Sequence, residues 1–371
     1  MADVLIAGAG PTGLAAALFL ARRGVAVRIF DKAPEPATTS KALAVNPRTL
    51  ELLAGTGVDE AIRAEGRPVG GMTLFEGGRQ VFTLDVAGLG LPQPMMVIPQ
   101  ARTEALLAQE LAAMGVMPER GIELAFEEQD ARAVHVRLTC GDGAEERTSA
   151  ALLLGADGAH SPVRHALGVG FPGHALPEPW ELADVRYASP VDAPEGYVEL
   201  REGGFVFAMA FDEARTLWRY ISTCGDPTAA GPPGAPAVAE VPWRSTFKIS
   251  HRIADRLAVG RVALAGDAAH LHSPMGARGM NLGIEDAYVF AACATRALAA
   301  GSADRIADYG LLRRAVDRAV VRRVELLTHV VRGRGAVGLL RRLAPLAGLL
   351  PAPPRGVVNA IVGLDHPVRV S

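Results

Sequence analysis

Residues 266–287, with the sequence GDAAHLHSPMGARGMNLGIEDA, gather the side chains of this chain that are most able to do chemistry. They include three acids, two histidines and four glycines, and almost no bulky apolar side chain. Such a stretch could be a metal site, a phosphate loop or the edge of a cofactor pocket. On a strand-to-loop turn, His270 and His272 beside Asp267 would need a further ligand, so the pattern does not favour a metal. His272 could instead lie near a substrate and help proton transfer.

The stretch ADVLIAGAGPTGLAAALFLARRGVAVRIFDKAP, residues 2–34, has the pattern of a nucleotide site. Residues 4–7 are an apolar run, typical of a central parallel strand, and residues 14–23 predict a helix. Three glycines stand between them in the spacing Gly-x-Gly-x-x-Gly: Gly8, Gly10 and Gly13. This spacing permits a tight turn, lets a pyrophosphate approach the backbone, and allows the helix to pack closely on the strand. Asp31 ends a second predicted strand, where its carboxylate could accept hydrogen bonds from ribose hydroxyls.

Residues 168–173 and 333–338 repeat the glycine spacing without its context. The first stretch follows a helix-like segment and leads into a proline-rich loop. The second stretch lies in an arginine-rich helical tail that leaves no room for a further strand-helix-strand unit. We therefore expect one dinucleotide-binding domain and no second one for a nicotinamide.

Two more predicted strands end in turns that contain glycine and an acid. Residues 151–154 lead into GADGAHSPVR, residues 155–164, and residues 261–265 lead into the stretch described first. Because ligands of open α/β folds bind at the carboxyl ends of parallel strands, the three turns could meet at one edge of a sheet.

Together these motifs resemble the FAD-dependent monooxygenases of the aromatic-hydroxylase type, the para-hydroxybenzoate hydroxylase-like family, over nearly the whole chain. GAGPTG resembles the family's dinucleotide fingerprint. GADGAHSPVR resembles its DG motif, which in the family touches FAD and helps engage NAD(P)H. Residues 260–287 resemble its GD motif and the following helix, where the acid, here Asp267, binds the ribityl chain. IPQARTEALLAQEL, residues 98–111, resembles the segment whose Gln and Arg lie beside the cofactor.

The resemblance implies a set of residues for the cofactor and for catalysis. The cofactor-binding candidates are Gly8, Gly10, Pro11, Thr12, Gly13, Asp31, Lys32, Lys41, Gln100, Arg102, Asp157, Gly266, Asp267, Pro274, Gly276, Gly279, Met280 and Asn281. Pro274, expected close to the flavin ring, and His272 are the catalytic candidates, and no metal is expected. Lys41 stands where the family usually has Arg, and loses the forked geometry of a guanidinium. Ala277 replaces a family glycine, although alanine does not adopt a positive φ freely.

The expected architecture is an α/β fold with a Rossmann-like FAD-binding domain, an inserted antiparallel β-sheet substrate domain and a helical C-terminal segment. The FAD-binding domain is discontinuous and takes three ranges: 1–70, 95–170 and 258–330. The substrate domain takes residues 71–94 and 171–257, because residues 72–86 and 197–225 read as hairpins with glycine turns. By alternation along these strands, the candidates for substrate binding are Phe205, Phe207, Met209, Trp218 and Tyr220; an ordinary sheet core is the alternative.

The C-terminal part, residues 331–371, is expected to be helical. Residues 336–350, AVGLLRRLAPLAGLL, fit a helix packed across the flavin domain better than a helix at a membrane surface.

The composition limits the partners and the compartment. The 371-residue chain has a formal net charge of −2, which argues against a nucleic-acid partner. Its three cysteines lie far apart, as suits a reduced cytoplasmic protein, and offer no disulfide framework. Residues 4–21 are apolar but are broken by glycines and lack the features of a signal peptide, so no stable membrane insertion is expected. We expect a monomer or a homodimer.

The resemblance implies a reaction in two halves. NADPH or NADH delivers a hydride to FAD, and the reduced flavin with O2 forms a C4a-hydroperoxide that hydroxylates a small aromatic substrate, phenolic or polyketide-like. Small residues at Gly276, Ala277 and Gly279 would let backbone amides stabilise the reduced flavin. Two alternatives remain. One is a flavin oxidoreductase of the same fold that acts without oxygen insertion or on a quinol or other non-aromatic ring. The other is a non-catalytic flavin-binding or ligand-binding protein.

Overall fold

A computed structural model describes residues 2–39, 42–229, 231–332 and 355–370. Its first sheet has six strands in the order β18-β19-β12-β1-β2-β8. These strands are β1 (Val4–Ala7), β2 (Val27–Asp31), β8 (Glu119–Arg120), β12 (Leu152–Gly155), β18 (Ala258–Val259) and β19 (Val262–Leu264). All neighbours in this sheet are parallel except β18 and β19, which form a hairpin. The strands that precede the three motifs are therefore adjacent and end at the same edge.

Helices cover this sheet because its central strands β1, β12 and β19 are apolar and buried on both faces. The helices of this part are α1 (Pro11–Ala21), α2 (Pro47–Leu53), α3 (Val58–Glu65), α4 (Gln100–Ala113), α5 (Pro162–Ala166) and α6 (Arg278–Ala300). Helix α1 packs against both α4 and α6. It begins directly after Gly10, with Pro11 in its first turn, so its N-terminus lies at the first motif.

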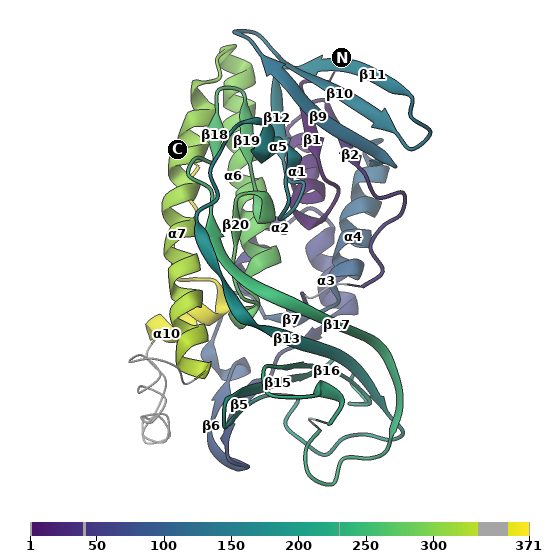
Figure 1. Cartoon of the computed structure of the whole chain (residues 1–371), viewed down its shortest axis with the longest axis vertical. Coiled ribbons are helices and arrows are strands. Elements are labelled where there is room, and N and C mark those ends of the chain that lie inside the picture. Colours follow the sequence, from purple (N-terminus) through teal and green to yellow (C-terminus); the bar gives the residue numbers. More distant parts are fainter. Residues whose placement is uncertain (1, 40–41, 230, 333–354, 371) are drawn as a thin grey trace.

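The second sheet has eight strands in the order β20-β17-β13-β16-β15-β14-β5-β6. Its strands are β5 (Gly71–Glu76), β6 (Arg79–Asp85), β13 (Gly173–Tyr187), β14 (Gly196–Arg201), β15 (Gly204–Ala210), β16 (Leu217–Ser222), β17 (Val238–Ile253) and β20 (His270–Leu271). The long strands β13 and β17 run from beside the six-stranded sheet to the lower end of the molecule in Figure 1. They connect the two sheets and carry the chain from one region to the other.

Smaller elements complete the fold. A three-stranded antiparallel sheet and a short sheet comprise β9 (Ile122–Gln129), β10 (Val134–Cys140), β11 (Glu145–Ala150), β3 (Ala44–Val45), β4 (Arg67–Pro68) and β7 (Met96–Val97). Four single 3-10 turns are η1 (Ala87–Leu89), η2 (Pro227–Ala229), η3 (Gly266–Ala268) and η4 (Met275–Ala277). The sheet of β9, β10 and β11, at the upper right of Figure 1, was not anticipated from the sequence.

The long helix α7 (Asp304–Arg332) runs along one side of both sheets, and α10 (Arg355–Val362) lies near its lower end (Figure 1). Helix α7 packs on α6 and on β17. No helix within the described residues is long and apolar enough to cross a bilayer. The predicted helix of residues 336–350 lies outside the described residues. The α/β fold with an additional antiparallel sheet and C-terminal helices is confirmed, whereas the exact ranges of the two domains stay a prediction.

Candidate functional site

The first motif makes a turn that only glycine can make at this place. Gly8 has a φ of 100°, and a side chain there would put its Cβ 2.2 Å from the carbonyl oxygen of Ala156. A Cβ on Gly13 would lie 1.9 Å from the carbonyl oxygen of Gly8. The first turn therefore lies directly against the second, and helix α1 approaches its strand as the glycine spacing predicts.

Asp31 holds the first turn in place. Its carboxylate accepts hydrogen bonds from the backbone N–H groups of Ala9, at 2.7 Å, and Ala33, at 2.8 Å. The acid expected to reach a ribose thus also fixes the glycine turn that would hold the pyrophosphate.

The second motif is anchored to the third. Asp157 accepts the backbone N–H of Val163 at 3.0 Å through Oδ2, while its Oδ1 has no partner among the described residues. Burial raises the pKa of the Asp157 carboxyl. Arg164, one residue further on, donates to the carbonyl oxygen of Ala268 at 2.9 Å. This bond ties the DG turn to the GD turn.

The third motif exposes its acid and buries its neighbours. Asp267 is exposed and lines the central cavity, whereas Gly266 and Ala268 are buried. The backbone N–H of Gly266 donates to Asp286 Oδ2 at 2.9 Å. A Cβ on Gly266 would lie 2.5 Å from Thr12 Oγ1, so this turn and the first helix are in close contact. Asp267 is therefore held toward the cavity by a rigid turn.

Behind this turn lies a fully buried cluster of charges. Arg313 on α7 donates to Asp286 at 2.6 Å and to Asp317 at 2.9 Å, and His270 lies 2.7 Å from Asp286. The carboxylates around His270 raise its pKa to about 9, although burial opposes this change. Burial and the neighbouring Asp286 raise the pKa of Asp317 to about 7.

Three members of this cluster are also close enough to share a metal ion: His270, Asp286 and Asp317. The Arg313 guanidinium already bonds both carboxylates and supplies the positive charge that a cation would bring. The absence of a metal stays a prediction, and this ion pair supports it.

The loop after the third motif has an unusual backbone. Gly276 has a φ of 75°, and Ala277 has a φ of 52° and a ψ of 38°. Ala277 thus adopts the left-handed conformation that the family's glycine would adopt more easily. Pro274, Gly276 and Gly279 all line the central cavity. The expected small-residue loop therefore faces the space where a ring could bind.

His272 also lines the cavity, and its tautomer follows from one bond. Its Nδ1 donates to the carbonyl oxygen of Ser273 at 2.8 Å, which leaves Nε2 as an acceptor without a described partner. Burial and the nearby His270, Arg278 and His251 lower its pKa to about 3. His272 is therefore neutral at neutral pH.

The cavity between the three motifs and the eight-stranded sheet has a volume of about 1420 Å³. Pockets for a single small ligand are usually about 300–1,000 Å³. The cofactor side of the lining includes Gln100, Asp267, Pro274, Gly276, Gly279 and Met280. The sheet side includes Leu74, Trp180, Phe205, Phe207, Ile221 and Phe247. The space is thus large enough for two ring systems, one against each side.

The model of the FAD binding domain family matches residues 1–220 and 227–324. The chain belongs to this family of FAD-binding proteins. The expected resemblance to aromatic-hydroxylase-type flavoproteins is thereby confirmed, and the cofactor is FAD.

Known relatives and solved structures agree with this membership. The 6-methylpretetramide 4-monooxygenase of Streptomyces rimosus is 38% identical over 304 residues, which cover 77% of this chain and 54% of the relative. The chain thus spans about half the length of that relative. The anhydrotetracycline hydroxylase OxyS from Streptomyces rimosus is 30% identical, with a TM-score of 0.77, over 98% of this chain and 76% of that chain. The p-nitrophenol 4-monooxygenase PnpA from Pseudomonas putida has a TM-score of 0.83 at 22% identity over 94% of each chain, a likeness of fold alone.

The residues of this FAD-binding chain fit the cofactor at three points. The glycine turn brings backbone amides and a helix N-terminus to one surface. Asp267 presents a carboxylate to the cavity, as a polyol chain requires. Gly276 and Gly279 line the cavity without side chains, so the backbone of this loop is open to a bound ring.

Four expected cofactor residues have other positions or partners. Lys41 lies outside the described residues, and Lys32 is exposed. Arg102 forms an exposed ion pair with Glu65 at 2.5 Å and does not line the central cavity. The side chain of Asn281 makes all its hydrogen bonds to protein atoms, so it acts on the fold rather than on the cavity.

Two of the expected substrate residues were placed on the wrong face. Phe205, Phe207 and Met209 on β15 line the cavity, but Trp218 and Tyr220 on β16 do not. Adjacent strands pair Phe207 with Ile221 and Ala208 with Tyr220, so Tyr220 shares the far face with Ala208.

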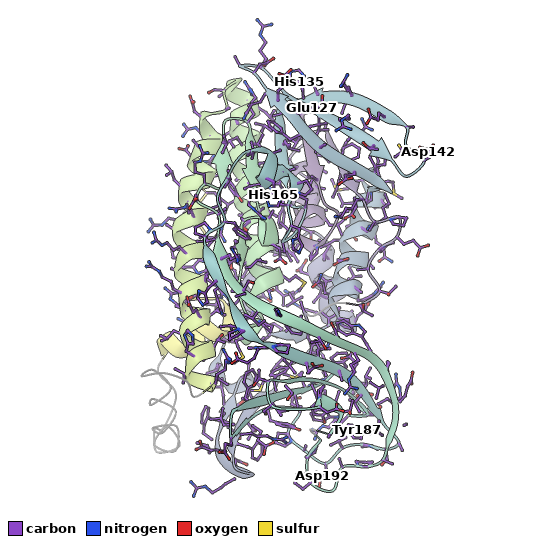
Figure 2. All side chains as sticks on the ribbon, viewed as in Figure 1. Glu127, His135, Asp142, His165, Tyr187 and Asp192 are labelled. Carbon is purple, nitrogen blue, oxygen red and sulfur yellow. The ribbon has the colours of Figure 1, made fainter. Side chains whose placement is uncertain are left out.

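That far face has a core of its own. Tyr187 donates to the Tyr220 hydroxyl at 3.0 Å, and Tyr187 lies near the lower end of the molecule in Figure 2. From the sequence, the aromatic residues of β16 are predicted as substrate residues. Arg219 and Ile221 on the same strand line the cavity and were missed. Alternation from Phe207 with the strand register would have found both residues, but the register is not readable from sequence.

Proposed function

We propose that this chain is an FAD-dependent monooxygenase that uses NADPH or NADH and O2 to hydroxylate a small aromatic substrate, phenolic or polyketide-like. One observation carries the proposal. The loop of residues 274–279, which follows the GD motif, faces the aromatic side of the sheet across a single cavity. A cofactor held by the motifs and a ring held by the sheet would meet there.

When bound, FAD would accept a hydride from the nicotinamide and, once reduced, activate O2 for transfer of one oxygen atom. The residues of this chain would bind, orient and enclose the reactants. Asp267 would hold a hydroxyl of the ribityl chain, and Pro274 would lie beside the ring. The apolar side chains of the sheet would exclude water from the reacting atoms.

His272 is the residue proposed to assist proton transfer. Its Nδ1 is fixed on Ser273, so Nε2 is the only ring nitrogen able to accept a proton. Its pKa of about 3 makes it a weak base unless a bound substrate supplies a partner. We assign it the role of a hydrogen-bond acceptor for a substrate hydroxyl.

The names of the relatives support the reaction class. The relatives 6-methylpretetramide 4-monooxygenase and anhydrotetracycline hydroxylase are named for oxygen insertion into 6-methylpretetramide and anhydrotetracycline. The cavity volume of about 1420 Å³ is consistent with a multi-ring substrate beside a flavin. Cytoplasmic location, a monomeric or homodimeric state and the choice of nicotinamide stay predictions.

The deciding experiment is a screen of NADPH and NADH oxidation by the FAD-loaded protein over phenols, quinols and polyketide aromatics. Peroxide is measured in parallel, and products are weighed after reaction under isotopically labelled O2. Label in the product supports the monooxygenase. Nicotinamide oxidation without label in any product identifies an oxidoreductase that does not insert oxygen. Aromatic binding without any nicotinamide oxidation identifies a ligand-binding protein.

A further inference from the structure

A buried ion pair stands on the cavity-facing side of the eight-stranded sheet. Arg219 on β16 and Asp184 on β13 are direct neighbours in the strand register. The guanidinium donates from Nε to Oδ1 and from Nη2 to Oδ2, each at 2.8 Å. The two side chains are only 4% and 12% exposed, and Arg219 lines the cavity. The forked geometry makes this a strong and well-oriented pair.

Aromatic rings hold the Arg219 guanidinium in place. Its central carbon lies 4.9 Å from the ring centre of Phe211 and 5.0 Å from that of Trp243. Such contacts stabilise a cation that has lost part of its water. Arg219 therefore has a fixed position, and its charge is already matched by Asp184.

The surrounding cavity wall is apolar. Among the described lining residues on β5, β6, β13, β14, β15 and β16, Arg219 is the one charged side chain. Its neighbours on these strands include Met209, Ile221 and Phe207.

Basic side chains of the cavity lie elsewhere. Lys248 and Arg252 on β17 also line the cavity, but the strand register places them opposite Pro179 and Gly173 of β13, five and eleven residues from Asp184. Arg252 donates to the carbonyl oxygen of Phe171 at 3.0 Å. An anionic group beside Arg219 would therefore lie several residues along β13 from these cations.

The electrostatic consequence follows from the net charge of the pair. A carboxylate that enters an apolar cavity loses its hydration, and only a cation without a charged partner offsets the free-energy cost of this loss. Asp184 cancels the charge of Arg219 and would also repel an approaching anion. A neutral oxygen, such as that of a carbonyl or an amide, meets no such repulsion.

We propose that Asp184 is a specificity-determining residue, which sets the cavity for uncharged aromatic substrates and against aromatic carboxylates through its pairing with Arg219. This inference rests on the proposed function, because it names the substrate class of the same cavity. Asp184 acts through Arg219 and is not a catalytic residue.

The test is equilibrium binding, measured by calorimetry on the FAD-loaded protein, of two probes with nearly equal shape. 2-Naphthamide is neutral and 2-naphthoate is anionic. The wild-type protein is expected to bind the amide at least about tenfold more tightly than the carboxylate. In Asp184→Asn, which keeps the side-chain size and an acceptor for Arg219, the ratio should shift toward the carboxylate by about tenfold or more.

Two further variants test whether Arg219 causes the shift in the affinity ratio. Arg219→Gln in the Asp184→Asn background should abolish the gain in carboxylate binding. Asp226→Asn removes the acid from the exposed Asp226–Arg244 pair, which does not line the central cavity, and should leave the wild-type ratio unchanged.

The proposal is overturned if the wild-type protein binds the carboxylate as tightly as the amide, or if Asp184→Asn leaves the ratio unchanged. Circular dichroism shows whether Asp184→Asn folds. If it does not fold, the ratio of amide to carboxylate affinity in the wild-type protein alone decides the proposal. Binding is measured without turnover. If the two probes bind in the expected ratio but no product contains labelled oxygen, the monooxygenase proposal is rejected. The role of Asp184 in binding then still holds.

Discussion

The side chain of Asn281 on α6 joins two parts of the chain that are 235 residues apart, because its Oδ1 accepts the backbone N–H of Asn46 at 3.0 Å. The same oxygen accepts from Thr49 Oγ1 at 2.7 Å. Its Nδ2 donates to the carbonyl oxygens of Ala44, at 2.9 Å, and Ala277, at 2.6 Å. One buried amide thus holds the loop beside the cavity, the start of α6 and the N-terminus of α2 together.

Asn281→Ala should therefore lower the free energy of unfolding by about 3 kcal/mol, because it leaves a buried N–H and a buried carbonyl without partners. Urea denaturation measures the change. Thr295→Ala on the same helix is the control. The Thr295 hydroxyl makes one bond, to the carbonyl oxygen of Ala291, so its loss should cost about 1 kcal/mol or less. Equal effects of the two variants would contradict the role given to Asn281.

The nucleotide-binding part of the fold was readable from sequence because its demands are local. Gly8 and Gly13 are required by contacts of 2.2 Å and 1.9 Å that any side chain would make, and Asp31 follows the next strand. The strand, turn and helix are contiguous in the chain, so their spacing alone predicts them.

The substrate side was less readable, because it depends on which strands pair and in which register. Trp218 and Tyr220 fit the expected alternation, but the register places Arg219 and Ile221 on the cavity face instead. The buried pair of Arg313 and Asp286 was also missed. Its residues lie 27 positions apart on two helices, and no local pattern marks them.

Ala277 stores strain that glycine would release. A left-handed φ of 52° costs an L-residue about 1 kcal/mol relative to glycine. We expect Ala277→Gly to raise the free energy of unfolding by about that amount, as measured by urea denaturation. Ala292→Gly, in the interior of α6, should lower it by about 1 kcal/mol. A loss of stability in Ala277→Gly would show that the loop tolerates alanine without strain.

Asp267 is expected to hold FAD through its ribityl chain. Asp267→Ala should weaken FAD binding by about tenfold or more, since a charged acceptor for a hydroxyl is worth about 1.5–3 kcal/mol. Flavin retained after gel filtration, and titration of the apoprotein with FAD, measure the loss. Asp192→Ala changes an exposed acid at the lower end of the molecule in Figure 2 and should retain full flavin. Full flavin in Asp267→Ala as well would reject the assignment.

His251 should make the protein sensitive to acid. It is 3% exposed, and neither ring nitrogen has a partner among the described residues. Burial lowers its pKa to about 4; the nearby His174 and His329 act in the same direction, and Glu325 opposes them. Its pKa in the unfolded chain is near 6.5. Between these two values the unfolded chain binds a proton that the folded chain does not, so stability falls as pH falls through this window.

Replacement of His251 by leucine removes both the titration and the two unpaired nitrogens. Between about pH 7.5 and about pH 5, the free energy of unfolding of the wild-type protein should fall by about 2 kcal/mol more than that of His251→Leu. The difference arises because only the wild type carries the buried imidazole. Urea denaturation at the two pH values measures the difference. His135→Leu, which replaces a side chain that is 38% exposed at the top of Figure 2, should follow the wild type. If His251→Leu loses as much stability as the wild type, the imidazole is not buried unpaired in the folded protein.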